Sequence, residues 1–315
     1  MTDIRELGEF GLLERLTGNI RTDAGIIKGI GDDTAVLVAG EGDHELVTTD
    51  MLVSGDHFNT DWHSPWQIGW KSMIVNVSDI AAMGGLPDYA LVSMALPDDI
   101  QVESLDEVFK GMLKACEKYG FTIIGGDTTH GDQLVINVVM LGHVEKNSLR
   151  LRSDAHEGDI ICLTGDLGKS WAGLELLRAG KEGYTDFHLR PDCRLETARK
   201  LAPYVNAMID VSDGLASEVN HICRESRLGA EIILEDIPIS ERTIETGKKL
   251  GKDPMEWALS GGEDFELLYT VSEEQYEKIK STKPIMIGKI TEKGVYIIDH
   301  NKKSPLTGGY DHFKR

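Results

Sequence analysis

ELVTTDMLV (Glu45–Val53) is a β-prone apolar run that three polar residues, TTD, interrupt before its end. This composition predicts a strand that carries polar side chains at a functional end. Further along, Ser64 is suited to cap a helix, Pro65 to occupy its first position, and Gly84 and Gly85 to end it. The sequence therefore predicts a strand followed by a long helix.

Strands and helices continue to alternate beyond this unit. A helix is predicted over 103–119, a strand followed by a loop over 121–131, and a long buried strand over Leu134–Val144. The composition then turns polar, and we place a domain boundary at about residue 150, giving domains 1–150 and 151–315. This alternation predicts α/β architecture in both halves. The second half is predicted to contain a strand–turn–helix unit over 159–177, a strand leading into a loop over 208–214, a strand over 230–235, and helices over 192–204, 215–226 and 240–250.

The charge of the chain excludes several classes of partner. Its 315 residues include 33 Lys and Arg against 53 Asp and Glu, a formal net charge of −20. Because so acidic a chain repels nucleic acids and acidic membrane surfaces, we expect neither as a partner. No signal peptide or apolar stretch of about 20 residues is visible, and the four cysteines are scattered, so we expect reduced thiols and a cytoplasmic protein.

Aspartate recurs wherever an apolar run breaks into Gly, Ser or Thr. Any one such site alone is typical of an ordinary turn. Carboxylates gathered at strand ends, however, repel one another unless cations bridge them, and hard oxygen ligands suit Mg²⁺ or Mn²⁺. Since Mg²⁺ commonly binds substrate phosphates as well, the sites together predict a metal-dependent phosphate site. They are GIGDDTA (Gly29–Ala35), VTTDM (Val47–Met51), NVSDIAAMGG (Asn76–Gly85), IIGGDTTHG (Ile123–Gly131), LTGDLGKS (Leu163–Ser170), IDVSDG (Ile209–Gly214) and SGGEDFE (Ser260–Glu266).

The familiar nucleotide-binding motifs do not match. LTGDLGKS nearly meets the Walker A pattern, but Leu163 stands where the first glycine is required. We expect a strand–turn–helix joint there and leave its role open. Gly29-Ile30-Gly31 lacks the third glycine of a dinucleotide fingerprint, and 188–192 and 264–266 do not match the kinase loops.

The order of these motifs, together with TTDMLVSGDHF and the terminal GGYDHF, closely resembles the thiamine-monophosphate kinase family. That family belongs to a superfamily with aminoimidazole ribonucleotide synthetase, selenophosphate synthetase and the hydrogenase-maturation dehydratase. The match runs from about Gly8 to Phe313, and SGGED with GYDHF separates the kinase from its cousins. The resemblance implies the two-domain α/β (α+β) fold of this superfamily, with an amino-terminal sheet domain that dimerises and a carboxyl-terminal α/β domain.

The resemblance also implies an activity and a set of site residues. The activity would be ATP-dependent phosphorylation of thiamine monophosphate to thiamine diphosphate, with several Mg²⁺ ions, in a cytoplasmic homodimer. The metal site would comprise Asp33, Thr48, Thr49, Asp50, Asp79, Asp127, Asp210 and Asp213. ATP would contact Gly126, Asp127, Arg152 and Ser212. Thiamine monophosphate would contact His57, Glu263 and Tyr310. Arg150 lies two residues from Arg152 and competes with it for the ATP role.

The chemistry of the acceptor agrees with direct transfer. A phosphate oxygen is already anionic near neutral pH, so it needs positioning and charge cancellation rather than a general base. We therefore assign no catalytic base and expect His57 to orient or contact the substrate; a purely structural His57 is the alternative. Two other functions stay open: another ATP-cleaving synthetase of the superfamily, and a nucleotide- or metal-binding module without turnover.

Overall fold

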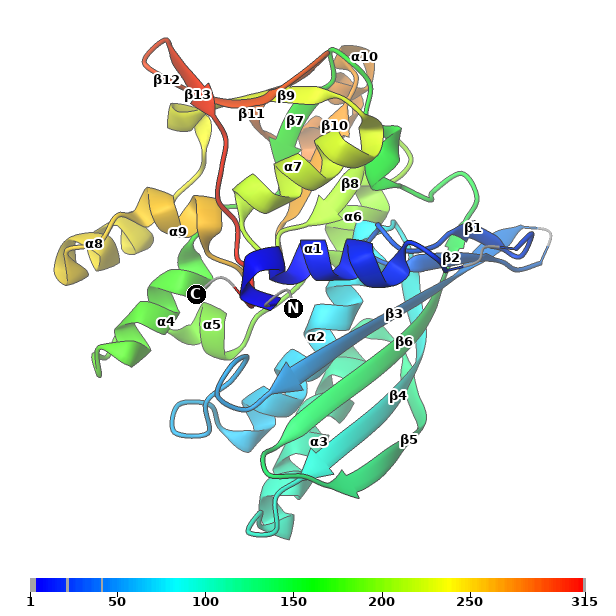
Figure 1. The fold of residues 1–315 in the computed structure, drawn as a ribbon, viewed down its shortest axis with the longest axis vertical. Helices are drawn as coiled ribbons and strands as arrows, with labels where there is room; N and C mark the ends of the chain where they lie inside the picture. Colours follow the sequence, from blue (N-terminus) through cyan, green and yellow to red (C-terminus); the bar gives the residue numbers. More distant parts are fainter. Residues whose placement is uncertain (1–3, 21–22, 41, 314–315) are drawn as a thin grey trace.

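Helix α2 (Pro65–Ala82) lies between two β-sheets and contacts both of them (Figure 1). The computed structural model of the chain describes residues 4–20, 23–40 and 42–313. Ser64 caps α2 by accepting the backbone N–H of Gln67, while the Gln67 side chain accepts the N–H of Ser64 in return. This capping box and the proline at the first turn confirm the predicted start of the helix.

The first sheet is built from the amino-terminal half in the order β1-β2-β3-β6-β4-β5. Its described strand pairs are antiparallel, except β4 with β5. The strands are β1 (Ile26–Lys28), β2 (Ala35–Val38), β3 (Asp43–Val53), β4 (Leu86–Leu96), β5 (Thr122–His130) and β6 (Val135–Glu145). Because side chains alternate along each strand, the sheet has an inner face that packs on α2 and an outer face.

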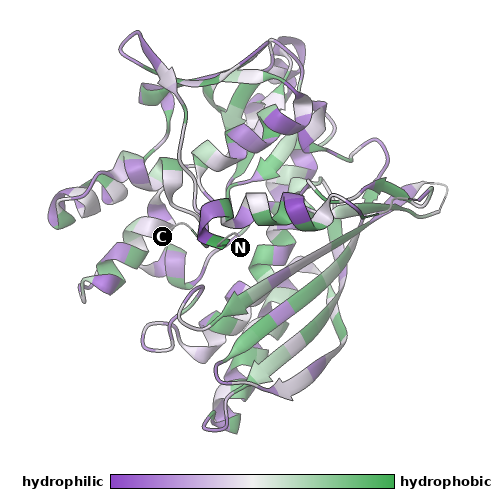
Figure 2. Cartoon of the chain, in the orientation of Figure 1, coloured by the Kyte–Doolittle hydropathy of each residue, from purple (hydrophilic) through white to green (hydrophobic). Residues whose placement is uncertain are grey.

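The two faces of this sheet differ in what covers them. On the inner face Leu46, Val138 and Met140 are fully buried. On the outer face Met51 and Tyr89 are about half exposed, at 55% and 50%. Figure 2 shows hydrophobic residues along much of β4 and β6, whereas β3 is mixed. In the described part of the chain this apolar outer face therefore remains accessible to solvent.

The second sheet is built from the carboxyl-terminal half in the order β13-β12-β9-β11-β7-β10-β8. It is mixed, with β12 parallel to β9 and the other described pairs antiparallel. The strands are β7 (Ile160–Leu163), β8 (Met208–Asp210), β9 (Gly229–Ile233), β10 (Leu267–Val271), β11 (Ile285–Thr291), β12 (Val295–Asp299) and β13 (Lys302–Pro305).

The remaining helices surround these sheets. They are α1 (Ile4–Thr17), α3 (Val102–Tyr119), α4 (Lys169–Arg178), α5 (Asp186–Leu189), α6 (Leu195–Leu201), α7 (Leu215–Ser226), α8 (Glu241–Leu250), α9 (Pro254–Ser260) and α10 (Glu273–Tyr276). Short 3-10 helices cover Arg152–Asp154, Leu234–Asp236 and Glu277–Thr282. Among the described residues, no helix has the length and apolar character that a membrane crossing needs.

Most predicted elements are confirmed, with a few corrections. The predicted loop within 121–131 is wrong, because β5 continues as a strand to His130 beside β4. The helix predicted over 192–204 is shorter, at Leu195–Leu201. The sequence patterns did not identify β4 or α1. The four cysteines are free thiols, as expected.

Candidate active site

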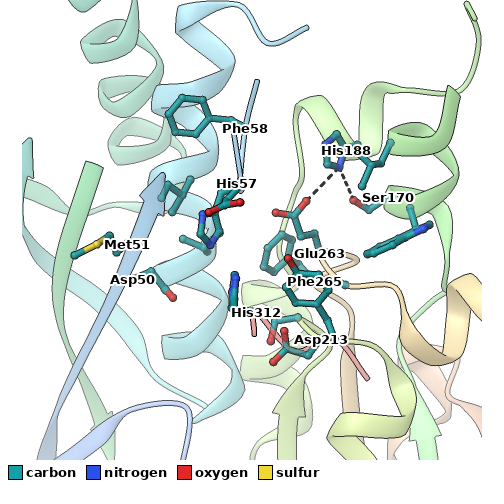
Figure 3. A pocket seen from close by; sticks show the side chains of 18 of the residues that line it. Asp50, Met51, His57, Phe58, Ser170, His188, Asp213, Glu263, Phe265 and His312 are labelled. Atoms are coloured by element: carbon teal, nitrogen blue, oxygen red, sulfur yellow. Dashed lines mark hydrogen bonds and ion pairs between the residues drawn. The ribbon is translucent and has the colours of Figure 1, made fainter. Parts of the chain in front are cut away.

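A cavity of about 350 Å³ opens between the two halves of the chain. In Figure 3, Asp50 and His57 line the cavity from the amino-terminal half of the chain. They face Glu263 and His188, which line it from the carboxyl-terminal half. The cavity is thus lined by both carboxylates and rings, a combination suited to a ligand that has a phosphate and an aromatic part.

Three aspartates converge beside this cavity. Asp33 lies between β1 and β2, Asp79 in the last turn of α2, and Asp210 at the end of β8. One carboxylate oxygen from each lies within 4.8 Å of those of the other two. The family resemblance places all three residues in one metal site, and the structure brings their side chains together.

Hydroxyl groups hold two of these carboxylates in place. Thr48 Oγ1 donates to Asp79 Oδ2 at 2.6 Å, and Ser78 Oγ donates to Asp210 Oδ2 at 2.5 Å. Thr48 therefore reaches the cluster from the inner face of β3, which Asp50 shares because the two residues are two apart. The Asp79 and Asp210 side chains are thereby oriented toward a common point.

The electrostatics of the cluster suit a cation. Burial and then the carboxylates of Asp50 and Asp210 raise the pKa of Asp79 well above its usual value. Burial and then Asp33 likewise raise the pKa of Asp210. Burial raises the pKa of Asp50 to about 6, with Asp33 adding to the effect. Carboxylates that resist ionisation together, and that offer only oxygen ligands, fit Mg²⁺ or Mn²⁺.

Arg152, rather than Arg150, lies at this cluster. Arg152 Nη2 is 2.6 Å from Asp33 Oδ1, and the Arg152 backbone N–H donates to Asp32. The Arg150 guanidinium instead donates to backbone carbonyls, including that of Asn147 at 2.8 Å. The two arginines do not share one strand face, because 152 begins a 3-10 helix. Position alone therefore favours Arg152 as the arginine that could meet a phosphate.

A second acidic group lies next to the first. Asp213 lines the cavity, and its backbone N–H donates to Glu218 Oε1 at 2.9 Å. Burial, and then Glu9, raise the pKa of Asp213 to about 7, while burial and Asp213 raise the pKa of Glu218. Sequence reasoning missed Glu218, although it follows IDVSDG by one helical turn. Ser212 also lines the cavity.

The Glu263 carboxylate is held by contacts at both of its oxygens. Its Oε1 is 2.6 Å from Lys71 Nζ, and its Oε2 is 3.2 Å from His188 Nδ1, which also lies 3.2 Å from Ser170 Oγ (Figure 3). Although burial opposes ionisation, Lys71 and His188 hold the pKa of Glu263 well below its usual range. Glu263 is therefore an anion at neutral pH.

A chain of rings continues along the cavity wall. The centroids of His57 and His312 are 5.1 Å apart, those of His312 and Tyr310 are 4.9 Å apart, and those of Tyr310 and Trp171 are 6.2 Å apart. His57 Nδ1 accepts the Val53 backbone N–H at 3.1 Å, so in its neutral form the ring carries its proton on Nε2. In this tautomer the neutral ring is a hydrogen-bond donor at Nε2, and its Nδ1 is already occupied by the backbone.

Tyr310 is tied to the acidic side of the cavity by its backbone. Its N–H donates to the Asp213 carbonyl at 2.9 Å. Gly308 and Gly309, just before it, have φ of +127° and +106°, and a Cβ on Gly308 would lie 2.5 Å from Ser260 Oγ. Glycine is required there, because other residues rarely adopt this backbone conformation. The carboxyl-terminal segment thus places the Tyr310 ring against the cavity.

Comparison with known proteins agrees with this geometry. The family model "AIR synthase related protein, N-terminal domain" matches residues 31–144, and "AIR synthase related protein, C-terminal domain" matches 156–300. The thiamine-monophosphate kinase of Aquifex aeolicus is 37% identical over 317 residues, covering 98% of this chain and 99% of that protein. The chain belongs to the thiamine-monophosphate kinase family. The enzyme of that name from Bacillus subtilis is 38% identical, covering 98% of this chain and all of the relative.

Two solved structures share this fold. AaThiL complexed with AMPPCP and TMP has a TM-score of 0.90 and 36% identity, covering 99% of each chain. Hydrogenase maturation protein HypE in complex with ATP shares the fold, with a TM-score of 0.72 at 20% identity over 98% of each chain. The two-domain α/β architecture expected from the motifs is therefore confirmed.

Three residues expected from the thiamine-monophosphate kinase resemblance lie elsewhere in this chain. Gly126 and Asp127 are on β5, the exposed edge strand, and neither lines the cavity. Thr49 points to the outer sheet face, where its hydroxyl contacts Asn137 Oδ1 at 3.3 Å. Two strands separate β5 from β3, which corresponds to roughly 14 Å at the usual strand spacing. Within one chain, Asp127 and Asp50 therefore lie too far apart to ligate the same ion.

The LTGDLGKS turn is a strand–turn–helix joint between β7 and α4, as predicted. The Asp264 carboxylate accepts the backbone N–H groups of Gly168 at 2.5 Å and Ser170 at 3.0 Å. Lys169 pairs with the buried Glu266. A protein carboxylate thus occupies the amino end of α4, where a Walker A loop would bind phosphate.

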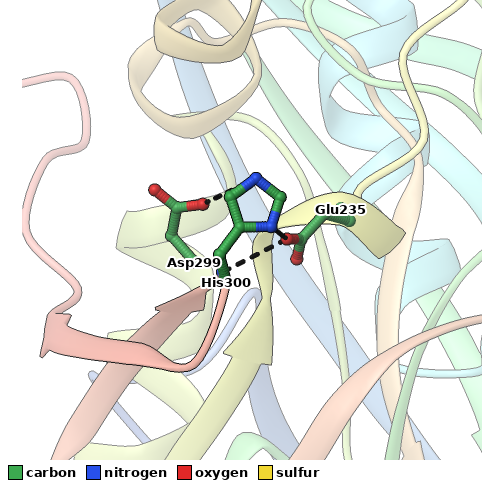
Figure 4. Close-up of side chains that lie close together, drawn as sticks. All are labelled: Glu235, Asp299 and His300. Atoms are coloured by element: carbon green, nitrogen blue, oxygen red, sulfur yellow. Dashed lines mark hydrogen bonds and ion pairs between the residues drawn. The ribbon is translucent and has the colours of Figure 1, made fainter.

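A second group of residues that could hold a metal ion lies on the surface of the chain. Glu235, Asp299 and His300 meet near the turn between β12 and β13 (Figure 4). All three are exposed, and His300 Nδ1 is 2.8 Å from Glu235 Oε1. None of them lines the cavity. The contact is that of a surface ion pair, whereas Asp33, Asp79 and Asp210 are more buried and meet beside the cavity.

Proposed function

We propose that the chain transfers the γ-phosphoryl group of ATP to thiamine monophosphate, giving ADP and thiamine diphosphate. The supporting observation is that one cavity holds the acidic group of Asp50, Asp79, Asp210 and Asp213 together with Glu263 and the ring of Tyr310. The similarity to AaThiL, whose structure holds AMPPCP and TMP, supports the same pair of substrates.

In the proposed reaction an oxygen of the acceptor phosphate attacks the γ-phosphorus, and the bond from that phosphorus to the bridging oxygen of ADP breaks. The attacking oxygen is already anionic, so no residue has to remove a proton from it. Asp33, Asp79 and Asp210, with Asp50 and Asp213 beside them, would hold Mg²⁺ ions. When bound, these ions would cancel the repulsion between the two phosphates.

The residues of the chain supply positioning. Arg152, held by Asp32 and Asp33, offers the guanidinium closest to the acidic cluster for a phosphate of ATP. Glu263 presents a fixed negative charge to the cationic thiazolium, and the rings of His57 and Tyr310 offer flat surfaces to the acceptor. Alignment of the two substrates is the main catalytic contribution that this geometry supports.

A coupled assay of ADP release tests this function. Thiamine monophosphate should stimulate ADP release, whereas substrates of the related synthetases should not. A synthetase would respond to its own acceptor instead, and a binding module would release no ADP with any of them. Absence of stimulation by thiamine monophosphate would contradict the proposal.

Replacing Tyr310 by Ala should raise the KM for thiamine monophosphate several-fold and leave the KM for ATP nearly unchanged. The physical reason is the loss of a ring surface for the acceptor, worth roughly 0.5–2 kcal/mol. Tyr310→Phe should keep most of the binding. Steady-state kinetics with each substrate varied in turn provides the measurement. An equal rise for both substrates together with a lower Tm would show that Tyr310 only packs the terminal segment.

We further propose that a second copy of the chain covers the apolar outer face of the first sheet. This pairing would shield Met51 and Tyr89 and would place another molecule over Thr49 and Asp127. Sedimentation should then give twice the mass of one chain. Tyr89→Glu should shift the protein toward the monomer, because it introduces a charge on the covered face. Val102→Glu, on the exposed surface of α3, is the matched control and should leave the mass unchanged.

A further inference from the structure

Lys71 is a fully buried lysine in the middle of α2. The side chains around it on this helix are mostly apolar; Ile68, Met73 and Ile74 are also buried. An ammonium group in such surroundings persists only where other groups compensate its charge. Nothing in the chemistry assigned above uses this residue, so its contacts require another explanation.

The Lys71 ammonium joins two segments that line the cavity. Nζ is 2.6 Å from Glu263 Oε1 and donates to the His57 backbone carbonyl at 2.7 Å. His57 belongs to the segment between β3 and α2, whereas Glu263 belongs to the segment between α9 and β10. One charged group therefore fixes the distance between acceptor-side residues from the two halves of the chain. Lys71 itself does not line the cavity.

The Glu263 backbone explains why such an anchor is needed. Its φ is +66°, in the left-handed region that residues other than glycine rarely adopt, and Phe265 nearby has φ +49°. The Glu263 N–H donates to the Ser212 carbonyl at 2.8 Å, which brings this loop against the segment that carries Asp213. A strained loop of this kind holds one conformation only where its surroundings over-determine it.

We propose that Lys71 is a positioning residue for the acceptor substrate, acting through Glu263. The ammonium holds the carboxylate in place and supplies the countercharge that lets it stay ionised while facing the cavity. His188 secures the other carboxylate oxygen from α5. This inference rests on the proposed function, since it takes the cationic thiazolium of thiamine monophosphate as the group that Glu263 faces.

The test uses Lys71→Met, which keeps the length of the side chain and removes its charge. We expect the KM for thiamine monophosphate to rise roughly 10–100-fold, the range for a lost hydrogen bond to a charged group, and the KM for ATP to change little. Lys110→Met, on the exposed face of α3, is the matched control and should behave as the wild type. Equal rises in both KM values would overturn the proposal.

The double variant Lys71→Met/Glu263→Gln separates positioning from simple packing. If Lys71 acts through Glu263, the double variant should have a KM for thiamine monophosphate within about twofold of Glu263→Gln alone. This comparison holds even if Lys71→Met alone fails to fold, because the double variant leaves no unpaired charge. A further tenfold rise in the double variant would overturn the proposal. If the wild type released no ADP with thiamine monophosphate, the proposed function would itself fail, and this inference with it.

Discussion

Replacing Asp79 by Asn should lower turnover by roughly 10²–10³-fold, the usual cost of losing one preorganised electrostatic contact. Asn can still accept the Thr48 hydroxyl, so the side chain should keep its place while one negative charge is lost. The metal-free protein should be unharmed or slightly stabilised, because repulsion from Asp50 and Asp210 is relieved. Steady-state kinetics at saturating Mg²⁺, together with the Tm of the metal-free protein, would measure both effects.

Asp106→Asn, on the exposed face of α3, is the matched control for that variant. It removes the same charge from the chain but far from the cavity lining, so both turnover and Tm should stay near the wild-type values. Full activity of Asp79→Asn would show that the cluster of Asp33, Asp79 and Asp210 is not the metal centre.

Mg²⁺ with a non-hydrolysable ATP analogue should raise the Tm by several degrees at neutral pH. Binding at a hundred times Kd stabilises the folded state by about 2.7 kcal/mol, and the shift should grow with ligand concentration. The analogue with a chelator should give little shift, since the unbridged carboxylates would repel its phosphates. Differential scanning fluorimetry with and without the chelator gives the comparison, and equal shifts in the two samples would contradict metal-bridged binding.

The stability of the metal-free protein should also depend on pH. In the folded chain the pKa of Asp50 is raised to about 6 and that of Asp213 to about 7, from an unfolded value near 4. Between these values the folded state binds more protons than the unfolded state. The contribution of these two carboxyl groups to the free energy of unfolding is therefore fully present below about pH 4. It is lost as the pH rises toward 7. Saturating Mg²⁺ should reverse this trend, because the bound ions favour the ionised carboxylates; urea unfolding at pH 5 and pH 7.5 would show it.

The sequence predicted part of the acidic cluster beside the cavity. The family resemblance grouped Asp33, Asp79 and Asp210, and the structure brings their carboxylates together. The limits of α2 were also predictable, because Ser64 and Pro65 are local signals whose effect does not depend on tertiary contacts. Local chemistry of this kind can be read from a single sequence.

Residues whose role depends on sheet order could not be placed in the same way. GGDTTH was expected to form a loop, but it continues β5 at the edge of the sheet, and only the pairing with β4 decides this. Asp127 therefore lies away from Asp50 despite the similar motifs. Lys71 did leave a signal, as the one positive charge within a largely apolar helix, but its partner Glu263 is nearly two hundred residues away.

Helix α2 carries both Asp79 and Lys71, eight residues apart in one unbroken helix. At 1.5 Å per residue this separates the two positions by roughly 12 Å along the axis. A single inserted residue between them would turn one side chain by roughly 100° around the axis relative to the other. Evolution should therefore tolerate length changes in the segments that connect strands, but none between residues 71 and 79. An aligned set of relatives should show gaps elsewhere and an invariant spacing here.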